Sequence, residues 1–386
     1  MAGSTDDASY ARDSNEAVRS RLMSLDVFRG ATIGAMLLVN DPGDEQTVFW
    51  PLRHASGNGW TPTDLIFPFF LFIVGVSMAF SLPARLRRNA SRSAAFRHVL
   101  WRGVVLFTIG LLLNGALVKF DFSTWRVYGV LQRIAIVYVM GAILALWFGR
   151  RIWTAKLIGC LVAYWILLRY VPVPGFGVPT HDVPLLDPDR NLAAWLDRKL
   201  LAGHLFAGTY DPEGLLSTIP ALATALLGLL AGDWLRSEHT SRVKAPAMAV
   251  SGVACVALGE LLGVWFPVNK TLWTSSYVIL TGGMALLVLA LCYAVLDVWQ
   301  WRRWWTVAFL VFGMNAIAAY VFGSVLAIAL YLWPVGDLSA QEFIYQELFA
   351  PLAGPFTASL LYAATFVLVC WAGMWWLYRK RIFLKI

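Results

Sequence analysis

Ten long apolar runs, separated by short polar segments, dominate the chain. Most of them approach the roughly 20 residues that a helix needs to cross about 30 Å of hydrocarbon. Only helices and closed barrels satisfy every backbone polar group in lipid, and these runs are too long and continuous for barrel strands. The pattern therefore predicts an all-α bundle of about ten transmembrane helices. The expected helices cover residues 25–40, 64–82, 99–118, 127–148, 152–171, 214–232, 245–266, 272–296, 304–332 and 356–378.

Lysine and arginine are distributed unevenly among the segments that join these runs. If the N-terminus is cytoplasmic, 22 of the 31 Lys and Arg residues lie on the cytoplasmic side and 8 on the other, while Arg133 lies within a run. Loops that remain in the cytoplasm carry an excess of these residues. The distribution predicts that both termini are cytoplasmic. It also predicts that the loop around His54 and the longest loop, 172–213, face the opposite side.

The composition agrees with a membrane protein. Hydrophobic residues make up 59% of the chain and charged residues 14%, whereas a soluble domain has about 25% charged residues. We expect residues 21–386 to form one domain that follows a disordered cytoplasmic tail, 1–20. The net charge of +8 follows from the membrane orientation, so no nucleic-acid partner is expected. No metal site is expected either, because the cysteines lie inside apolar runs without metal-ligand spacing: Cys160, Cys255, Cys292 and Cys370.

The segment 53–77, RHASGNGWTPTDLIFPFFLFIVGVS, places a polar loop directly before an apolar run. Histidine accepts and returns a proton near neutral pH, so His54 is a candidate catalytic base; a structural loop histidine is the alternative. Asp64 begins the apolar run. It could cap its own helix, or it could orient the His54 imidazole by accepting the second N–H. Further polar groups expected near this loop are Asn40, Asn58 and Trp60.

Charged residues inside the expected helices are a second source of candidates, because burying a charge in a membrane is costly. Arg133, which follows Gln132, and Glu260 both fall in the extracytoplasmic half of their helices and could pair. Such a pair could be a structural ion pair or could bind substrate, and both interpretations are kept. Asp26 and Arg29 lie in the first turns of the first run, where we expect them at the membrane interface or facing a cavity.

A second polar helix mouth reads PVNKTLWTSS. It places Lys270 among Asn269, Thr274 and Ser275 at the start of a helix, an arrangement suited to an anion or a sugar. Asn315 lies inside the ninth run, where a buried amide needs partners. The Asn315 amide could belong to a binding site, or it could form hydrogen bonds that join two helices.

Six segments occur in order along the chain: RLMSLDVFRGATIGAMLLVN, RHASGNGWTPTDLIFPFFLFIVGVS, GVLQRIAI, DPEGLLSTIPALATALLG, PVNKTLWTSSYVILTGG and FGMNAIAAY. Together they resemble the heparan-α-glucosaminide N-acetyltransferase family of transmembrane acyltransferases, over nearly the whole chain from about Arg21. The resemblance implies a multi-pass protein of the bacterial inner membrane. The expected form lacks the large luminal N-terminal domain and the additional helix of the lysosomal member.

The resemblance also implies a reaction, in which an acetyl group from cytoplasmic acetyl-CoA reaches an amino sugar across the membrane. The histidine, asparagine and aspartate of the family correspond to His54, Asn40 and Asp64. Where the family commonly reads HAxWNG, this chain reads HASGNGW, with Gly57 in place of tryptophan and Trp60 close by. Bacterial members are also associated with chitin and N-acetylglucosamine use. The alternative function is therefore a transporter for N-acetylglucosamine or a related sugar.

The implied reaction gives roles to several residues. His54 would be the general base on the sugar amine or the nucleophile that carries the acetyl group, and Asn40, Asn58 or Asn269 would donate to the oxyanion. Other expected partners are membrane lipids and, as one candidate assembly, a second copy in a homodimer. The nucleotide end of CoA would meet the basic cytoplasmic rim, although a plain orientation signal is the alternative there. The phosphate-binding candidates are Arg29, Arg85, Arg87, Arg88 and Arg102.

Overall fold

The computed structural model describes residues 22–88 and 91–384, and the expected disordered tail, 1–20, lies outside these residues. Regular structure in the described part is helical apart from a short hairpin of β1 (Pro334–Val335) and β2 (Leu338–Ser339). The predicted all-α fold is confirmed. The α-helices are α2 (Met23–Asn40), α3 (Ile66–Arg87), α4 (Arg92–Leu117), α5 (Val130–Trp147), α6 (Arg150–Tyr170), α7 (Leu192–Leu201), α8 (Thr218–Arg236), α9 (Ser241–Gly263), α10 (Ser275–Tyr293), α11 (Trp304–Met314), α12 (Ala316–Leu332), α13 (Ala340–Ile344) and α14 (Pro355–Arg379). Single turns of other helix types cover η1 (Trp50–Leu52), η2 (Pro62–Leu65), η3 (Ala294–Val298) and η4 (Tyr345–Phe349).

Most of the expected helices are long enough to cross a membrane. In the described chain, eight helices are long and apolar enough, and the number rises to nine if α11 and α12 together form one span. The first expected helix forms as α2. It carries Asp26 and Arg29 and is not among the eight. The molecule is therefore a multi-pass membrane protein with a helical bundle.

The ninth expected helix, 304–332, is wrong as a continuous element. The chain bends by 76° between α11 and α12. Asn315 stands at the break, with a backbone conformation outside the helical region (φ −126°, ψ 38°). Its side chain is held by the segment that follows α14, because Asn315 Nδ2 donates to Ile382 O (3.1 Å) and Asn315 Oδ1 accepts from Leu384 N (3.0 Å). A contact with a distant segment thus accompanies the bend.

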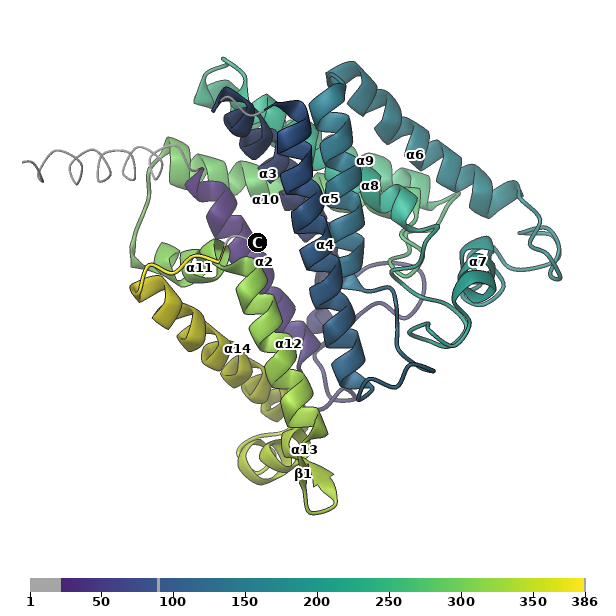
Figure 1. Ribbon diagram of the computed structural model, residues 1–386, viewed down its shortest axis with the longest axis vertical. Helices are drawn as coiled ribbons and strands as arrows, with labels where there is room; N and C mark the ends of the chain where they lie inside the picture. The colour runs from purple at the N-terminus through teal and green to yellow at the C-terminus, as the bar shows by residue number, and fades with distance from the viewer. Residues whose placement is uncertain (1–21, 89–90, 385–386) are drawn as a thin grey trace, which may run out of the picture.

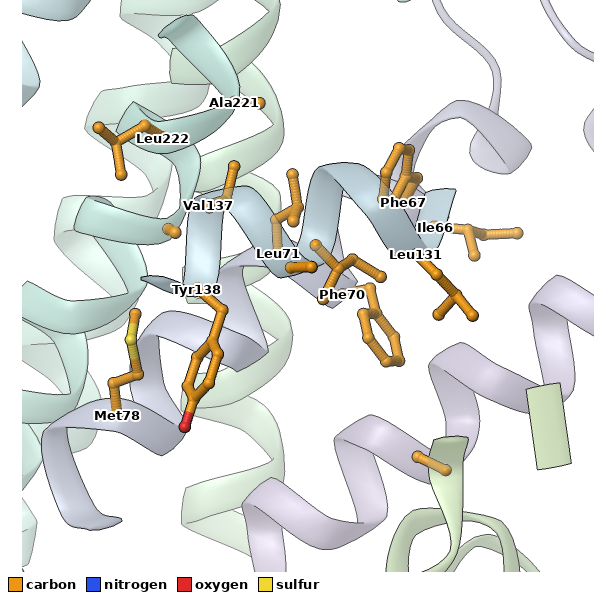
Figure 2. Packing of buried hydrophobic residues seen from close by; sticks show 14 of the residues in the cluster. Ile66, Phe67, Phe70, Leu71, Met78, Leu131, Val137, Tyr138, Ala221 and Leu222 are labelled. Carbon is orange, nitrogen blue, oxygen red and sulfur yellow. The ribbon is translucent and has the colours of Figure 1, made fainter. Parts of the chain in front are cut away.

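The centre of the bundle is built by α3, α5, α8 and α10. In its most apolar stretch, α8 is 72% buried, whereas α9 is only 17% buried, so α9 lies at the periphery of the bundle. Figure 2 shows side chains of the largest core cluster: Ile66, Phe67, Phe70, Leu71 and Met78 of α3 lie near Leu131, Val137 and Tyr138 of α5 and near Ala221 and Leu222 of α8. In Figure 1, α14 lies at the opposite edge of the molecule from α6 and α7.

Glycine brings two pairs of helices into backbone contact. A methyl group on Gly75 of α3 would overlap the carbonyl oxygen of Ala225 in α8, and one on Gly30 of α2 would overlap the carbonyl oxygen of Phe309 in α11. Gly313 of α11 faces α2 in the same way, since a methyl group there would overlap Asp26 O. Small residues of this kind allow membrane helices to approach closely. These contacts fix the positions of α3 and α8, whose first turns lie next to the loops described below.

Candidate functional site

Two loops that are far apart in the sequence meet at one end of the bundle. The loop before α3 and the loop before α10 are joined by a hydrogen bond from Gly59 N to Val268 O (2.7 Å). Asn269 Nδ2 donates to Asn58 Oδ1 (3.0 Å) and to Gly57 O (3.4 Å). Gly57 and Gly59 have φ angles of +100° and +106°, a region that favours glycine. Glycine at position 57, in place of tryptophan, therefore fits the positive φ angle of the loop at this residue.

His54 contacts Asp64, which also caps its own helical turn through a capping box with Thr61, so both contacts expected for this aspartate are present. His54 Nδ1 lies 2.7 Å from Asp64 Oδ1. Asp64 Oδ2 accepts from the backbone N–H groups of Ala55 (3.1 Å) and Thr61 (2.9 Å). The Asp64 side chain is fully buried, whereas 51% of the His54 side chain is exposed. Since an ionised carboxylate only accepts hydrogen bonds, His54 Nδ1 donates to Asp64, and Nε2 is the unprotonated nitrogen when the imidazole is neutral.

Lys270 completes this group, which we call the His54 cluster (His54, Asp64 and Lys270). Its Nζ lies 2.8 Å from His54 Nδ1, 3.0 Å from His54 Nε2 and 3.6 Å from Asp64 Oδ1. Burial lowers the pKa of Lys270, while the carboxylates of Asp64 and Glu213 act in the opposite direction. The sequence predicted a binding role for Lys270 but not its contact with His54, which lies 216 positions away.

The other polar residues of the second helix mouth shape the loop itself. Thr274 Oγ1 donates to Pro267 O (2.9 Å) and accepts from Asn269 N (3.0 Å). Ser275 Oγ donates to Leu161 O (2.7 Å). Asn269 Oδ1 accepts from Leu272 N (2.9 Å), so both ends of this amide are already bonded. Thr274 and Ser275 are buried, and the structure does not bring their hydroxyl groups to the surface of the site.

The expected pairing of Arg133 with Glu260 is wrong. The buried Arg133 Nη2 donates to Gly214 O (3.2 Å) and to Ser217 Oγ, and its guanidinium lies over the Trp273 ring, 5.0 Å from the centroid. Glu260 instead accepts from Trp60 Nε1 (2.9 Å). Gln132 Nε2 and Arg133 Nε and Nη1 are buried and find no partner in the described chain. Arg133 thus joins the segment before α8 to the loop before α10.

The segment before α8 contributes acidic residues that the sequence analysis missed. Arg126 donates to Asp211 through two nitrogens (2.8 and 2.6 Å) and to Glu213 Oε2 (2.5 Å). Asp197 of α7 accepts from Leu215 N (3.0 Å), and burial raises the pKa of Asp197 to about 6. The DPEG sequence before a long apolar run was the available signal. The negative charge of Glu213 raises the pKa of Lys270, against the larger effect of burial.

Asn40 is the last residue of α2 and is exposed. Within residues 22–88 and 91–384 it makes no hydrogen bond to His54, so the structure does not support the expected direct contact. The next residue, Asp41, is a partly buried acid, and burial raises its pKa to about 7. Among the described residues, no group of three or more His, Cys, Asp or Glu side chains could hold a metal ion.

Asp26, Arg29 and Asn315 form a separate group. Arg29 Nη1 donates to Asp26 Oδ1 (2.8 Å) and to Gly313 O (3.2 Å), and Nη2 donates to Ser77 Oγ (2.9 Å). These contacts tie α2, α3 and α11 together beside the bend at Asn315.

The basic residues at the end of α3 and in α4 remain candidates for binding phosphate. Arg102 Nη1 donates weakly to Tyr138 OH (3.4 Å), and its guanidinium lies over the Tyr138 ring. Arg85, Arg87 and Arg88 are exposed at the end of α3. No salt bridge to any of these four arginines occurs in the described part of the chain. Their positive charge is therefore available to an anion.

Comparison with known proteins gives a consistent result. The family model described as "Heparan-alpha-glucosaminide N-acetyltransferase, catalytic" matches residues 21–266. The heparan-alpha-glucosaminide N-acetyltransferase of Homo sapiens is 31% identical over 96% of this chain and 60% of its own length. The enzyme of the same name from Mus musculus is 29% identical over 98% of this chain and 62% of its own length. The chain thus spans about three fifths of the length of these curated relatives.

Proposed function

Because the chain belongs to the heparan-alpha-glucosaminide N-acetyltransferase family, we propose that it is a membrane acetyltransferase centred on His54. The donor is acetyl-CoA, and the acceptor is the amine of a glucosamine-type sugar. The observation that carries the proposal is the hydrogen bond between His54 Nδ1 and the fully buried Asp64 carboxylate. This contact fixes a proton on Nδ1, so that Nε2 is the basic nitrogen of the neutral imidazole, the form that either route of acetyl transfer requires.

Two routes use the same residues. In the direct route, His54 Nε2 takes a proton from the sugar amine while the amine nitrogen attacks the thioester carbon. The carbon–sulfur bond breaks, and the departing CoA thiolate receives the proton. In the two-step route, Nε2 itself attacks the thioester carbon, the carbon–sulfur bond breaks, and CoA leaves as the thiolate. The sugar amine then attacks the acetyl carbon of the acetyl-imidazole, the carbon–Nε2 bond breaks, and the amine proton passes to the CoA thiolate. Asp64 stabilises the positive charge that develops on the imidazole in both routes.

The acceptor would lie against the loop before α3. The Trp60 indole offers an apolar face to a sugar ring, and its Nε1 already holds the Glu260 carboxylate (2.9 Å). Trp60 is partly exposed and Glu260 is exposed, so both can meet a sugar. Asn58 contributes an amide beside them. Trp60 and Glu260 would thus provide the sugar contacts that Gly57, which has no side chain, cannot make.

The donor would approach from the basic end of the bundle. The exposed arginines at the end of α3 suit the phosphates of CoA, and the acetyl group then passes between the helices to His54. In this proposal the basic end faces the cytoplasm of a bacterium, and the His54 cluster lies at the other face of the inner membrane. A homodimer is the proposed assembly.

The test measures release of CoA from acetyl-CoA by the detergent-purified protein, with and without glucosamine. We expect glucosamine-dependent release that is lost in His54→Ala. His181→Ala is the matched control, because His181 Nδ1 also pairs with an aspartate, Asp182 (2.6 Å), in an exposed loop. It should retain wild-type turnover. Full activity in a folded His54→Ala protein would overturn the proposal, and binding of N-acetylglucosamine without any binding of acetyl-CoA would favour a transporter.

A further inference from the structure

Lys270 lies against the ring of the residue that has to accept a proton. Its Nζ is almost equally far from both imidazole nitrogens, at 2.8 and 3.0 Å. An atom at nearly equal distances from Nδ1 and Nε2 lies outside the lone-pair direction of either nitrogen. Nδ1 is also already engaged with Asp64. The amine therefore acts on the imidazole mainly through its charge.

The charged groups around His54 come from three segments. Asp64 of η2 contacts Nδ1 at 2.7 Å, and Lys270 of the loop before α10 contacts both ring nitrogens. Glu213, in the segment before α8, influences Lys270. A fully buried carboxylate favours the charged form of a neighbouring histidine, and a nearby cation disfavours it. Asp64 and Lys270 therefore act on His54 in opposite directions.

These opposing effects matter because only neutral imidazole can accept a proton or attack a thioester. A His–Asp pair alone would hold the imidazolium to a higher pH than free histidine does. A lysine cation at about 3 Å adds a like charge whenever the ring becomes protonated. The cluster with neutral His54 has one negative and one positive charge and is balanced.

We propose that Lys270 is a positioning residue that keeps the His54 imidazole neutral, by offsetting the charge of Asp64 at contact distance from both ring nitrogens. This inference rests on the proposed function for its meaning, since a neutral His54 is what acetyl transfer needs. It also removes Lys270 from the set of groups that bind an anionic substrate. The ammonium is paired with the Asp64 carboxylate (3.6 Å).

The test reads the protonation of His54 without acetyl-CoA or an acceptor. Of the two forms of histidine, diethyl pyrocarbonate acylates only the neutral imidazole, and mass spectrometry of the peptide that contains His54 gives the rate of its modification between pH 5 and 9. The wild type is compared with Lys270→Met, which is uncharged and of similar length, and with Lys270→Arg, which keeps the charge. Lys199→Met is the matched control, because Lys199 is exposed on α7 and belongs to no ion pair in the described chain.

We expect Lys270→Met to raise the pH of half-maximal modification by about one unit, which corresponds to a tenfold change in proton affinity. Lys270→Arg and Lys199→Met should resemble the wild type. Identical profiles for wild type and Lys270→Met would overturn the inference. So would an equal shift in Lys270→Met and Lys270→Arg, which would indicate a purely structural role.

A second variant covers the case in which Lys270→Met does not fold. Lys270→Cys can be purified and then treated with 2-bromoethylamine, which rebuilds a side chain ending in an amine. We expect the untreated protein to show the shifted profile and the treated protein to regain the wild-type profile, with treated wild type as the control. Because no step uses acetyl-CoA, a protein without CoA turnover that still shows this shift would refute the proposed function alone.

Discussion

Asp64 uses its two carboxylate oxygens for different tasks. Oδ1 faces His54 Nδ1, and Oδ2 faces two backbone N–H donors. In Asp64→Asn, the amide oxygen would remain with the two N–H groups, so the NH₂ group would face His54. The imidazole would then carry its proton on Nε2, and the base would be lost. We expect CoA release to fall by a factor of about 100 to 10,000, as for loss of general base catalysis.

The same substitution at a second His–Asp pair provides the control for this prediction. Asp182→Asn changes the partner of His181, which is exposed in the loop between α6 and α7. Turnover should remain at the wild-type level. An Asp64→Asn protein that keeps more than a tenth of wild-type activity would show that Asp64 does not select the tautomer of His54.

Asp41 gives a residue-scale prediction about pH. Its pKa is about 7 in the folded protein because of burial, against 3.8 for a free side chain. The folded state therefore keeps a proton that the unfolded chain releases, and stability falls as the pH rises from about 4 to 7. Asp41→Asn has no carboxyl group to titrate at this position, so this fall in stability with rising pH should be absent. The melting temperature of Asp41→Asn relative to wild type should rise across this window and level off above pH 7, whereas Asp337→Asn, at an exposed site, should show no such trend.

At the scale of elements, length and apolarity were sufficient to predict most helices, because few other structures can satisfy a long apolar segment in lipid. The bend at Asn315 could not be predicted, since its sequence neighbourhood is also compatible with a continuous helix. Its partners lie at residues 382 and 384. The pairing of Arg133 with Glu260 failed for a similar reason. Depth in the membrane is readable from sequence, but the direction in which a helix faces is not.

The close contact between α3 and α8 gives a prediction at this scale. Gly75→Ala would place a methyl group against the carbonyl oxygen of Ala225, so the helices would have to separate. We expect a loss of about 1–3 kcal/mol in stability, as for overpacked cores, visible as a lower melting temperature in detergent. Gly159→Ala on α6 is the control, because a methyl group there meets nothing within 4 Å. It should be neutral or slightly stabilising. Equal melting temperatures for both variants would contradict the close contact.

At the scale of the whole molecule, the distribution of Lys and Arg predicts the orientation in the membrane. Ser56 lies in the loop that carries His54, and Ser93 begins α4 at the other end of the bundle; both are exposed. In intact cells whose outer membrane has been permeabilised, Ser56→Cys should react with a maleimide that cannot cross the inner membrane. Ser93→Cys should react only after the cells are lysed. The wild type reports the background from its own cysteines. The reverse pattern would place the His54 cluster on the cytoplasmic side.

The site was predicted in part. His54 and Asp64 are ten positions apart on one loop and the turn that follows it, so their proximity was readable from the sequence. Lys270 and Glu213 approach them from other loops, and a single sequence does not state which loops are neighbours. The helix packing of the whole bundle decides this. The sequence was therefore sufficient to predict His54 and its orienting acid, Asp64. The contact with Lys270 and the nearby charge of Glu213 are known only from the structure.

The joining of two distant loops has a consequence for the order in which the protein is made. His54 and Asp64 leave the ribosome early, and Lys270 follows Asp64 by 206 positions. Tyr277, whose hydroxyl donates to Asp64 O (2.5 Å), comes later still. During synthesis the histidine and its acid are thus present long before the cation that balances them. The nascent chain acquires a complete His54 cluster only when α10 is inserted beside α3.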